Sequence, residues 1–292
     1  MPAAEIDISV DLVAALVEAQ HPDLAGPLRR VANGWDNVIF RLGEDLAVRL
    51  PRRAVAAALI ENEQRWLAEL APRLPVPVPV PVRTGAPSDA FGWPWSITPW
   101  FVGDPLGRLA LPDRRPYAAT LGRFLACLHT PAAPDAPRNP VRGIPLAGRS
   151  EALSRQLETV PLDRRDELRR LWDRLVDTPE WPGPPRWLHG DPHPGNVLVH
   201  DGALAAVIDF GDLTAGDPAT DLAVGWLAFD SSAREELRNQ YAQDRSLDDD
   251  TWTRARGWAL CLGVALIAHS DDEPVLAAVG HHALSEVLTG DR

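Results

Sequence analysis

The feature that most constrains the fold of this chain is residues 187–199, which read Trp-Leu-His-Gly-Asp-Pro-His-Pro-Gly-Asn-Val-Leu-Val. The prolines and glycines between His189 and Asn196 do not fit a regular helix or strand, so this part is expected to be a loop. Short strands are expected around residues 197–199 and 204–209, and Asp201-Gly202 between them is a typical two-residue hairpin turn. The sequence therefore predicts a polar loop that leads directly into a small hairpin.

Three polar side chains in this region have the chemistry that phosphoryl transfer needs. Asp191 lies five residues before Asn196, and Asp209 ends the apolar run that follows. Asp191 is the candidate catalytic base, because a carboxylate accepts or orients the hydroxyl proton when a phosphoryl group moves to an alcohol. Asn196 and Asp209 offer the oxygen ligands that suit Mg²⁺. We expect the hairpin to bring these two residues close together.

The pattern along the chain predicts an α+β fold with two lobes. Helices are expected at residues 9–20, 54–70, 116–129, 150–175, 218–229, 232–241, 249–269 and 273–288, and further strands at 28–31, 37–42, 45–50 and 95–98. The strands gather before residue 103, and mostly helices follow it. We therefore expect a small sheet-rich N-terminal lobe (residues 1–102) and a larger helical C-terminal lobe (residues 103–292).

Three separate motifs carry a resemblance to a known family. Residues 189–196 (His-Gly-Asp-Pro-His-Pro-Gly-Asn) resemble the catalytic loop of the aminoglycoside phosphotransferase family, a small-molecule kinase branch of the protein-kinase-like fold. Residues 208–212 (Ile-Asp-Phe-Gly-Asp) resemble its metal-binding segment, and residues 216–223 resemble the run that follows. The similarity extends from about Leu28 to the last helices. It implies a kinase-like fold, Mg²⁺, and ATP or GTP as co-substrate. It also implies that the N-terminal lobe covers the nucleotide and that the C-terminal lobe holds the catalytic and metal loops and the acceptor site.

The N-terminal half supplies residues that the resemblance assigns to the nucleotide. Residues 33–37 lie where the family has its nucleotide-covering loop, which implies contacts from Gly34 and Asn37. Arg49 lies where a lysine is more usual, so the resemblance implies that it contacts the α and β phosphates and pairs with a glutamate of the next helix. Of the two candidates we select Glu63 over Glu61, because its distance from residues 74–77 fits the family pattern.

The strand that ends at Thr98 is expected to lead into the hinge. The resemblance implies that the backbone from Thr98 to Trp100 meets the edge of the adenine. Simpler interpretations remain open for several residues. Arg49 and Glu63 could form only a surface salt bridge, which contributes little to stability. His189, His193, Asp217 and Asp221 are expected to hold the loop and cap a helix, without taking part in the chemistry.

Composition excludes several classes of function. The chain contains no lysine, so Schiff-base chemistry, a P-loop lysine and a lysine base are excluded. Its net charge of -12 argues against nucleic acid as a partner and is compatible with a cationic acceptor. Acidic residues of the helical lobe that could attract such an acceptor are Asp212, Asp230, Asp271 and Asp272. The acidic N-terminus and the absence of a long apolar run predict a cytoplasmic protein without membrane contact.

The leading hypothesis is a small-molecule O-phosphotransferase, whose acceptor is an aminoglycoside-like antibiotic or another hydroxylated metabolite. The family resemblance suggests antibiotic resistance, although the same fold also phosphorylates choline, homoserine, sugars and macrolides. One alternative is a kinase-like protein that binds a nucleotide without turnover. Another is a metallohydrolase, because His189, Asp191 and His193, with His200 nearby, superficially resemble a metal cluster. The sequence leaves the oligomeric state open.

Overall fold

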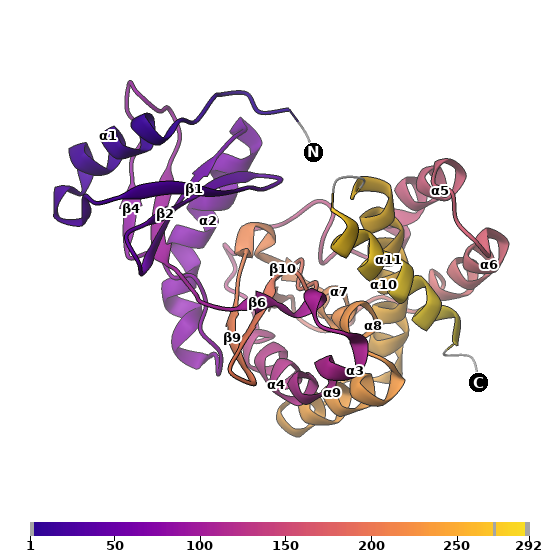
Figure 1. The fold of residues 1–292 in the computed structure, drawn as a ribbon. Coiled ribbons are helices and arrows are strands. Elements are labelled where there is room, and N and C mark those ends of the chain that lie inside the picture. The colour runs from indigo at the N-terminus through magenta and orange to yellow at the C-terminus, as the bar shows by residue number, and fades with distance from the viewer. Residues whose placement is uncertain (1–2, 271–272, 290–292) are drawn as a thin grey trace. The chain divides into compact units, whose positions relative to one another are not determined.

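A five-stranded antiparallel sheet lies at the centre of the first of two units into which the chain divides (Figure 1). The computed structural model describes residues 3–270 and 273–289. Unit 1 comprises Met1–Pro72, Pro77–Val102 and Ile208–Gly211, and unit 2 comprises Arg73–Val76, Gly103–Val207 and Asp212–Arg292. Two short segments, Arg73–Val76 and Ile208–Gly211, therefore belong to a different unit from the residues on either side of them in the sequence.

Unit 1 combines the sheet with two helices. The strands, in their order across the sheet, are β1 (Leu28–Asn33), β2 (Asn37–Leu42), β3 (Leu46–Pro51), β5 (Trp95–Pro99) and β4 (Arg83–Gly85). The helices are α1 (Val10–Gln20), which Ser9 caps by accepting from the N–H of Leu12, and α2 (Ala54–Leu70). Short 3₁₀ helices are η1 (Pro22–Leu24) and η2 (Ala71–Arg73).

One face of the sheet forms the core of unit 1, and this decides where Arg49 points. Val48 and Leu50 are fully buried in a cluster with α1. Successive side chains of a strand point to opposite faces, so Arg49 lies on the other face from Val48 and Leu50. The alternation of β3 thus places a cation on the sheet face that is not covered by α1.

Unit 2 consists mainly of helices with three short strands around a hairpin. Its helices are α3 (Leu111–Arg114), α4 (Ala118–Leu128), α5 (Ser150–Thr159), α6 (Arg165–Leu175), α7 (Ala219–Leu222), α8 (Val224–Ala228), α9 (Ser231–Asp244), α10 (Asp249–His269) and α11 (Pro274–Thr289). Its strands are β6 (Asp104–Pro105), β7 (Arg186–Leu188), β8 (Val197–His200), β9 (Ala203–Val207) and β10 (Thr214–Gly216), and its 3₁₀ helices are η3 (Leu106–Arg108), η4 (Arg115–Tyr117) and η5 (Leu146–Arg149). A further 3₁₀ turn, η6 (Phe210–Asp212), follows the hairpin. Helix α4 packs on α9, and α10 packs on α11.

The expected hairpin is confirmed. Strands β8 and β9 pair antiparallel, and the turn residues Asp201 and Gly202 have φ of 48° and 76°. Positive φ at both central residues is what a two-residue hairpin turn requires, and Asp and Gly tolerate it. Strand β6 adds a third member beside β8.

The sheet-rich N-terminal region and the helical C-terminal region confirm the α+β class, but two predicted helices were wrong in extent. Residues 150–175 form α5 and α6, not one helix. Pro161 cannot donate a helical hydrogen bond, and Arg164 adopts a left-handed conformation (φ 58°), so the chain breaks between them. The predicted helix 218–229 is likewise split into α7 and α8 at Ala223.

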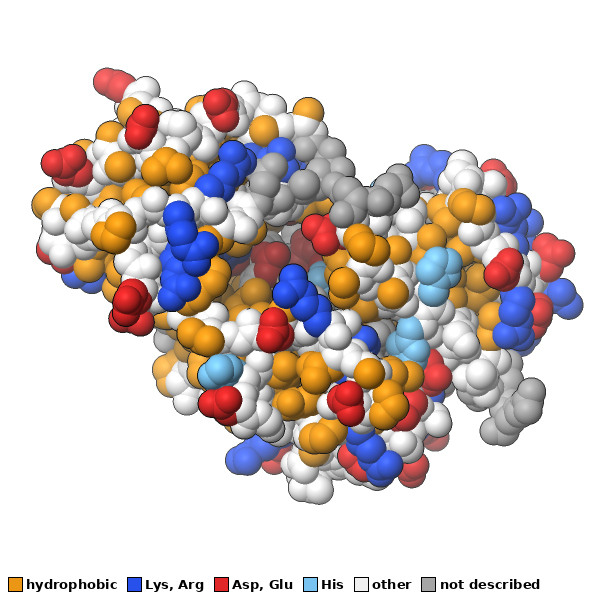
Figure 2. Space-filling model, in the orientation of Figure 1, with side chains coloured by type: hydrophobic (Ala, Val, Ile, Leu, Met, Phe, Trp, Pro, Cys, Tyr) orange, Lys and Arg blue, Asp and Glu red, His pale blue; other side chains and the backbone are white. Residues whose placement is uncertain are grey.

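Within the described residues no helix is long and apolar enough to cross a membrane. On the face shown in Figure 2, acidic and basic side chains are interspersed over both helical and sheet regions. On this face the excess negative charge is therefore not gathered into a single patch.

Candidate functional site

The loop that carries Asp191 is fixed by a buried carboxylate. Asp221, at 0% exposure, accepts hydrogen bonds from the N–H groups of His189 (2.7 Å) and Gly190 (2.9 Å). His129 Nε2 lies 3.1 Å from the same carboxylate, and its Nδ1 lies 2.9 Å from the hydroxyl of Tyr241. The predicted structural role of Asp221 is confirmed, because it holds the loop through the backbone.

Gly190 is required at its position by both conformation and space. Its φ is +89°, which strains any residue with a side chain. A Cβ atom there would lie 2.2 Å from the backbone oxygen of Asp212. The close approach of these two backbones sets the course of the chain just before Asp191.

Side chains of the loop fix it from within. The N–H of Asp191 donates to His189 Nδ1 (3.2 Å), and the N–H of Gly195 donates to His193 Nδ1 (3.0 Å). The side-chain N–H of Asn196 donates a hydrogen bond to the backbone oxygen of Asp191 (3.0 Å). This bond brings the predicted base and the predicted metal ligand together. It also leaves the amide oxygen of Asn196 as the atom suited to a metal ion.

An arginine and a histidine lie beside the carboxylate of Asp191. Arg142 Nη2 lies 3.5 Å from Oδ1, and His193 Nε2 lies 3.7 Å from Oδ2. Burial raises the pKa of Asp191, but the charges of His193 and Arg142 outweigh it and hold the pKa below its ordinary value of 3.8. The Asp191 carboxylate is therefore ionised at neutral pH and can accept a hydrogen bond from a hydroxyl.

Asp212 belongs to the same cluster. It accepts a hydrogen bond from Asn139 Nδ2 (2.7 Å), and Arg142 Nε lies 3.6 Å from its other oxygen. The sequence indicates Asp212 only as one of several acidic residues that could attract a cationic acceptor. Asp271 and Asp272, considered with it, lie outside the described residues, and Asp230 instead caps α9 by accepting from the N–H of Ala233.

In unit 1, Arg49 joins two of the predicted residues. Its Nη1 lies 2.6 Å from Glu63 Oε2, and its Nη2 lies 3.3 Å from Asp209 Oδ1. The choice of Glu63 as the partner of Arg49 is therefore confirmed. The alternative interpretation as a surface salt bridge is wrong, because the side chains of Arg49 and Glu63 are only 7% and 1% exposed. Burial alone would lower the pKa of Arg49, but Glu63 and Asp209 outweigh it and raise that pKa.

Asp209 differs from its two partners in exposure and backbone. Its side chain is 56% exposed, so most of the carboxylate remains accessible beyond the contact with Arg49. Its φ is +63°, a left-handed conformation that aspartate and asparagine adopt more readily than most residues. A carboxylate oxygen presented in this way suits a hard cation such as Mg²⁺.

The loop of residues 33–37 is closed by its own backbone. The N–H of Gly34 donates to the oxygen of Asn37 (2.9 Å), and Arg52 donates to the oxygen of Gly34 (2.9 Å). Asp36 forms an ion pair with Arg53, and Asn37 is buried. Gly34 and Asn37 therefore shape a tight turn between β1 and β2, and their contact with a nucleotide stays a prediction.

At the end of β5, Thr98 and Trp100 have different roles. Thr98 pairs with Ala47 of β3 and is buried. The N–H of Trp100 donates to the oxygen of Asp45 (2.7 Å), and its indole ring packs against the guanidinium of Arg41 at 5.0 Å. The N–H of Trp100 is therefore already used within unit 1.

Comparison with known proteins shows the family. The model of the phosphotransferase enzyme family matches residues 27–258. The chain belongs to this family. A search of curated proteins gave no significant match to this phosphotransferase.

Solved structures similar to this phosphotransferase share its fold at low sequence identity. The GDP and kanamycin complex of APH(2")-IIia is 19% identical, with a TM-score of 0.70, and the alignment covers 96% of this chain and 99% of that one. Macrolide 2'-phosphotransferase MphH from Brachybacterium faecium, as the apoenzyme, is 23% identical, with a TM-score of 0.65 and coverage of 94% and 98%. The streptomycin–ATP–APH(2")-IIa ternary complex is 18% identical, with a TM-score of 0.59 and coverage of 96% and 97%.

The metallohydrolase alternative finds no support in the geometry of this phosphotransferase. Among the described residues, no three His, Cys, Asp or Glu side chains are grouped so as to hold a metal ion. His189 is completely buried, and both His189 and His193 use Nδ1 to accept loop N–H groups. Their predicted role in holding the loop is confirmed.

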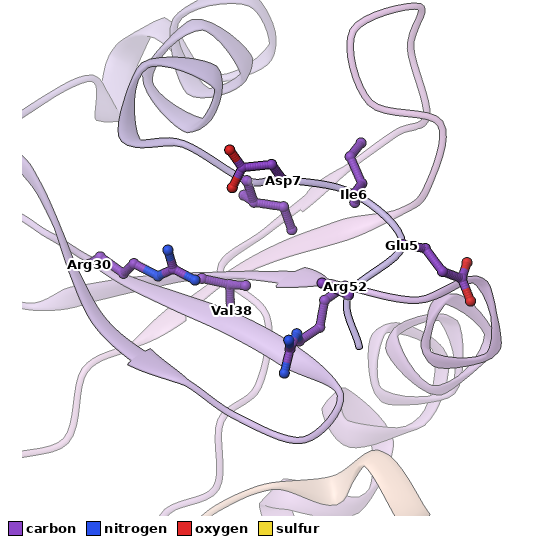
Figure 3. A pocket seen from close by; sticks show the side chains of 8 residues that line it. Glu5, Ile6, Asp7, Arg30, Val38 and Arg52 are labelled. Carbon is purple, nitrogen blue, oxygen red and sulfur yellow. The ribbon is translucent and has the colours of Figure 1, made fainter. Parts of the chain in front are cut away.

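A cavity of about 270 Å³ in unit 1 is lined by none of the predicted site residues (Figure 3). The labelled residues come from the segment before α1, from β1 and β2, and from the position just after β3: Glu5, Ile6, Asp7, Arg30, Val38 and Arg52. Glu5 accepts a hydrogen bond from the N–H of Ala54 at the start of α2, and Arg52 bonds to Gly34. These contacts tie the N-terminal segment and the loop of residues 33–37 to unit 1.

The buried pair of the phosphotransferase gives a stability prediction. Glu63→Gln leaves the buried Arg49 without its short charged partner, and among the described residues the 3.3 Å contact with Asp209 is the ion pair that remains. We expect the free energy of unfolding to fall by about 2 kcal/mol or more, because removing one member of a buried ion pair strands the other. Chemical denaturation of the purified variant measures this loss.

The neighbouring residue Glu61 provides the control. It lies two residues earlier on α2 and is exposed, so Glu61→Gln should change stability by less than about 0.5 kcal/mol. Equal stability of the two variants would show that the ion pair of Arg49 and Glu63 does not stabilise the fold.

Proposed function

We propose that this phosphotransferase moves the γ-phosphate of a magnesium–nucleoside triphosphate complex to a hydroxyl group of a small molecule. The observation that carries the proposal is the fixed loop of Asp191: its backbone oxygen accepts a hydrogen bond from Asn196, Asp221 braces the loop, and its carboxylate is ionised at neutral pH. Membership of the phosphotransferase family supports the same conclusion.

Asp191 is proposed to orient the acceptor hydroxyl and to take its proton as the oxygen–phosphorus bond forms. In phosphoryl transfer the protein contributes mainly by positioning groups and neutralising charge, so a base of low pKa suffices. The hydrogen bonds of His189 and Asn196 to the backbone of Asp191 keep the carboxylate at one place. This rigidity supports a positioning role for the loop.

Asn196 and Asp209 are proposed to hold the Mg²⁺ ion. Both offer hard oxygen atoms: the amide oxygen of Asn196 is left over by its bond to Asp191, and the carboxylate of Asp209 is largely exposed. Val197 pairs with Val207 in the hairpin, so the chain that follows Asn196 returns to the same end before Asp209, which supports a shared ion. When bound, Mg²⁺ neutralises charge on the phosphate oxygens.

Arg49 is proposed to bind the nucleotide phosphates. Glu63 holds Nη1 of the guanidinium, and Nη2 lies beside Asp209, the proposed Mg²⁺ ligand, so phosphate oxygens bound to the same ion would lie close to Nη2. A guanidinium binds phosphate through a planar fork, unlike the point charge of a lysine. Gly34, Asn37, Thr98 and Trp100 are proposed to surround the remainder of the nucleotide. One similar structure is a complex with GDP and another a complex with ATP, so the co-substrate is proposed as either ATP or GTP.

The acceptor is proposed to be a hydroxylated small molecule of the antibiotic or sugar type. The similar structures include complexes with kanamycin and with streptomycin, and a macrolide 2'-phosphotransferase. Resistance to such an antibiotic is the biological role that this class of acceptor suggests.

A nucleotide-consumption screen tests the proposal. The purified protein is incubated with Mg²⁺ and ATP or GTP in the presence of aminoglycosides, macrolides, sugars and amino alcohols, and products are examined by mass spectrometry. We expect at least one acceptor to gain the mass of one phosphoryl group with release of the nucleoside diphosphate. Nucleotide binding without any phosphorylated product would instead support a kinase-like binding protein without turnover.

A further inference from the structure

Arg142 lies on a loop that is fixed on both sides of it. The N–H of Asn139 donates to Thr214 Oγ1 (2.9 Å), and the N–H of Gly143 donates to Thr220 Oγ1 (3.1 Å). Gly143 has a φ of +68°, and a Cβ atom there would lie 2.8 Å from a methyl carbon of Leu188. The backbone that carries Arg142 is therefore a built part of unit 2.

The guanidinium of Arg142 lies between two carboxylates, one of which is the proposed base. It is 3.5 Å from Asp191 and 3.6 Å from Asp212, and its side chain is 17% exposed. These distances exceed those of a forked arginine–carboxylate pair, so the guanidinium does not form the tight bidentate bridge typical of a structural role. Its Nη1 also donates to the backbone oxygen of Val141 (3.5 Å), and its five N–H groups give it more hydrogen-bonding capacity than these three contacts use.

The position of this charge bears on what can approach Asp191. A reacting hydroxyl has to come within hydrogen-bond distance of the Asp191 carboxylate. An ammonium group on the carbon next to that hydroxyl would then lie near the guanidinium, and two like charges that are shielded from water repel strongly. Without Arg142, Asp191 and Asp212 would instead form an acidic pair that attracts an ammonium group. Arg142 thus reverses the preference that the two carboxylates alone would give.

We infer that Arg142 is a specificity-determining residue, which makes the protein favour acceptors whose reacting hydroxyl has no ammonium group beside it. The acceptor class is then a neutral hydroxyl compound, such as an uncharged sugar. This inference rests on the proposed function, because it assigns the acceptor side to Asp191. The net charge of -12 is compatible with a cationic acceptor, but the charge beside Asp191 decides which acceptor binds, and there Arg142 is positive.

The test compares a cationic probe with its neutral form. Kanamycin and fully N-acetylated kanamycin share a scaffold, and acetylation removes the ammonium charges while adding acetyl groups. Their dissociation constants are measured by calorimetry in the presence of a nucleoside diphosphate, and the variants are compared on each probe. We expect Arg142→Gln to bind kanamycin at least about tenfold more tightly than the wild type, because a like charge is removed from the site. Arg142→Lys keeps the charge and should retain the wild-type preference for the acetylated form.

Two further variants make the result decisive. Arg155→Gln removes the same charge from an exposed position on α5, where Arg155 pairs with Glu151, and should leave both affinities unchanged. Arg142→Met keeps the aliphatic stem and provides a second neutral variant should the glutamine variant unfold. No gain in kanamycin affinity in either neutral variant, or an equal gain for the acetylated form, would overturn the inference. Because binding is measured without turnover, this result is separate from the acceptor screen.

Discussion

Asp191→Asn should reduce turnover by at least about a hundredfold while leaving nucleotide affinity nearly unchanged. The amide keeps the shape of the side chain, and the backbone bonds of Asp191 to His189 and Asn196 do not depend on the carboxylate. What is lost is the negative charge that accepts or orients the acceptor proton. Initial rates at saturating nucleotide, and nucleotide dissociation constants from calorimetry, separate these two effects.

The electrostatics around Asp191 sharpen this prediction. Its pKa lies below the ordinary value because His193 and Arg142 overcome the effect of burial, so the wild-type carboxylate is ionised at all pH values from mildly acidic upward. The rate of the variant should therefore not recover at high pH. Asp173→Asn, an exposed carboxylate on α6, is the matched control and should keep wild-type activity. Wild-type turnover in Asp191→Asn would remove Asp191 from its proposed role.

The sequence predicted the parts of the site that depend on local pattern. The loop of Asp191 could be recognised because proline and glycine exclude regular structure there, and the hairpin because Asp201-Gly202 fits a turn with two positive φ angles. The pair of Arg49 and Glu63 could be predicted because the family resemblance relates the third strand to the following helix. In each case the signal lay within a short stretch or within a motif of known order.

Arg142 could not be predicted in the same way. It is one of 29 arginines and lies 49 residues before Asp191, in a proline-rich segment without periodicity. Its position depends on the hydrogen bonds that Asn139 and Gly143 donate to Thr214 and Thr220, and the sequence pattern does not reveal these bonds. Contacts between distant loops depend on the tertiary course of the chain, whereas propensity and periodicity report only on neighbours in sequence.

The errors in the fold have similarly physical causes. Strands β6, β7 and β10 contain two or three residues, too few for an alternating pattern to be visible. The charged pattern from residue 150 to residue 175 fits one helix, but Pro161 and the left-handed Arg164 divide it. Here the proline was a stronger signal than the spacing of charges, because it removes a hydrogen bond that no side-chain pair replaces.

Asp209→Asn should have the second large effect, on the use of Mg²⁺. We expect turnover to fall by about a hundredfold, and the Mg²⁺ concentration for half-maximal rate to rise at least about tenfold, because a carboxylate ligand is replaced by a weaker neutral oxygen. Asparagine is chosen because it tolerates the φ of +63° at this position, so the backbone is kept. Arg49 retains its 2.6 Å contact with Glu63, so the proposed phosphate-binding arginine stays in place.

The measurement that isolates the metal is nucleotide affinity with and without Mg²⁺. In the wild type Mg²⁺ should tighten nucleotide binding, and in Asp209→Asn this gain should largely disappear, while the affinity without Mg²⁺ stays the same or rises slightly, since one negative charge has been removed from beside the phosphates. Asp201→Asn is the matched control: it makes the same chemical change at another aspartate with positive φ (48°), in an exposed hairpin turn. An unaltered Mg²⁺ dependence in Asp209→Asn would assign the metal to other groups and leave Asp209 only as the partner of Arg49.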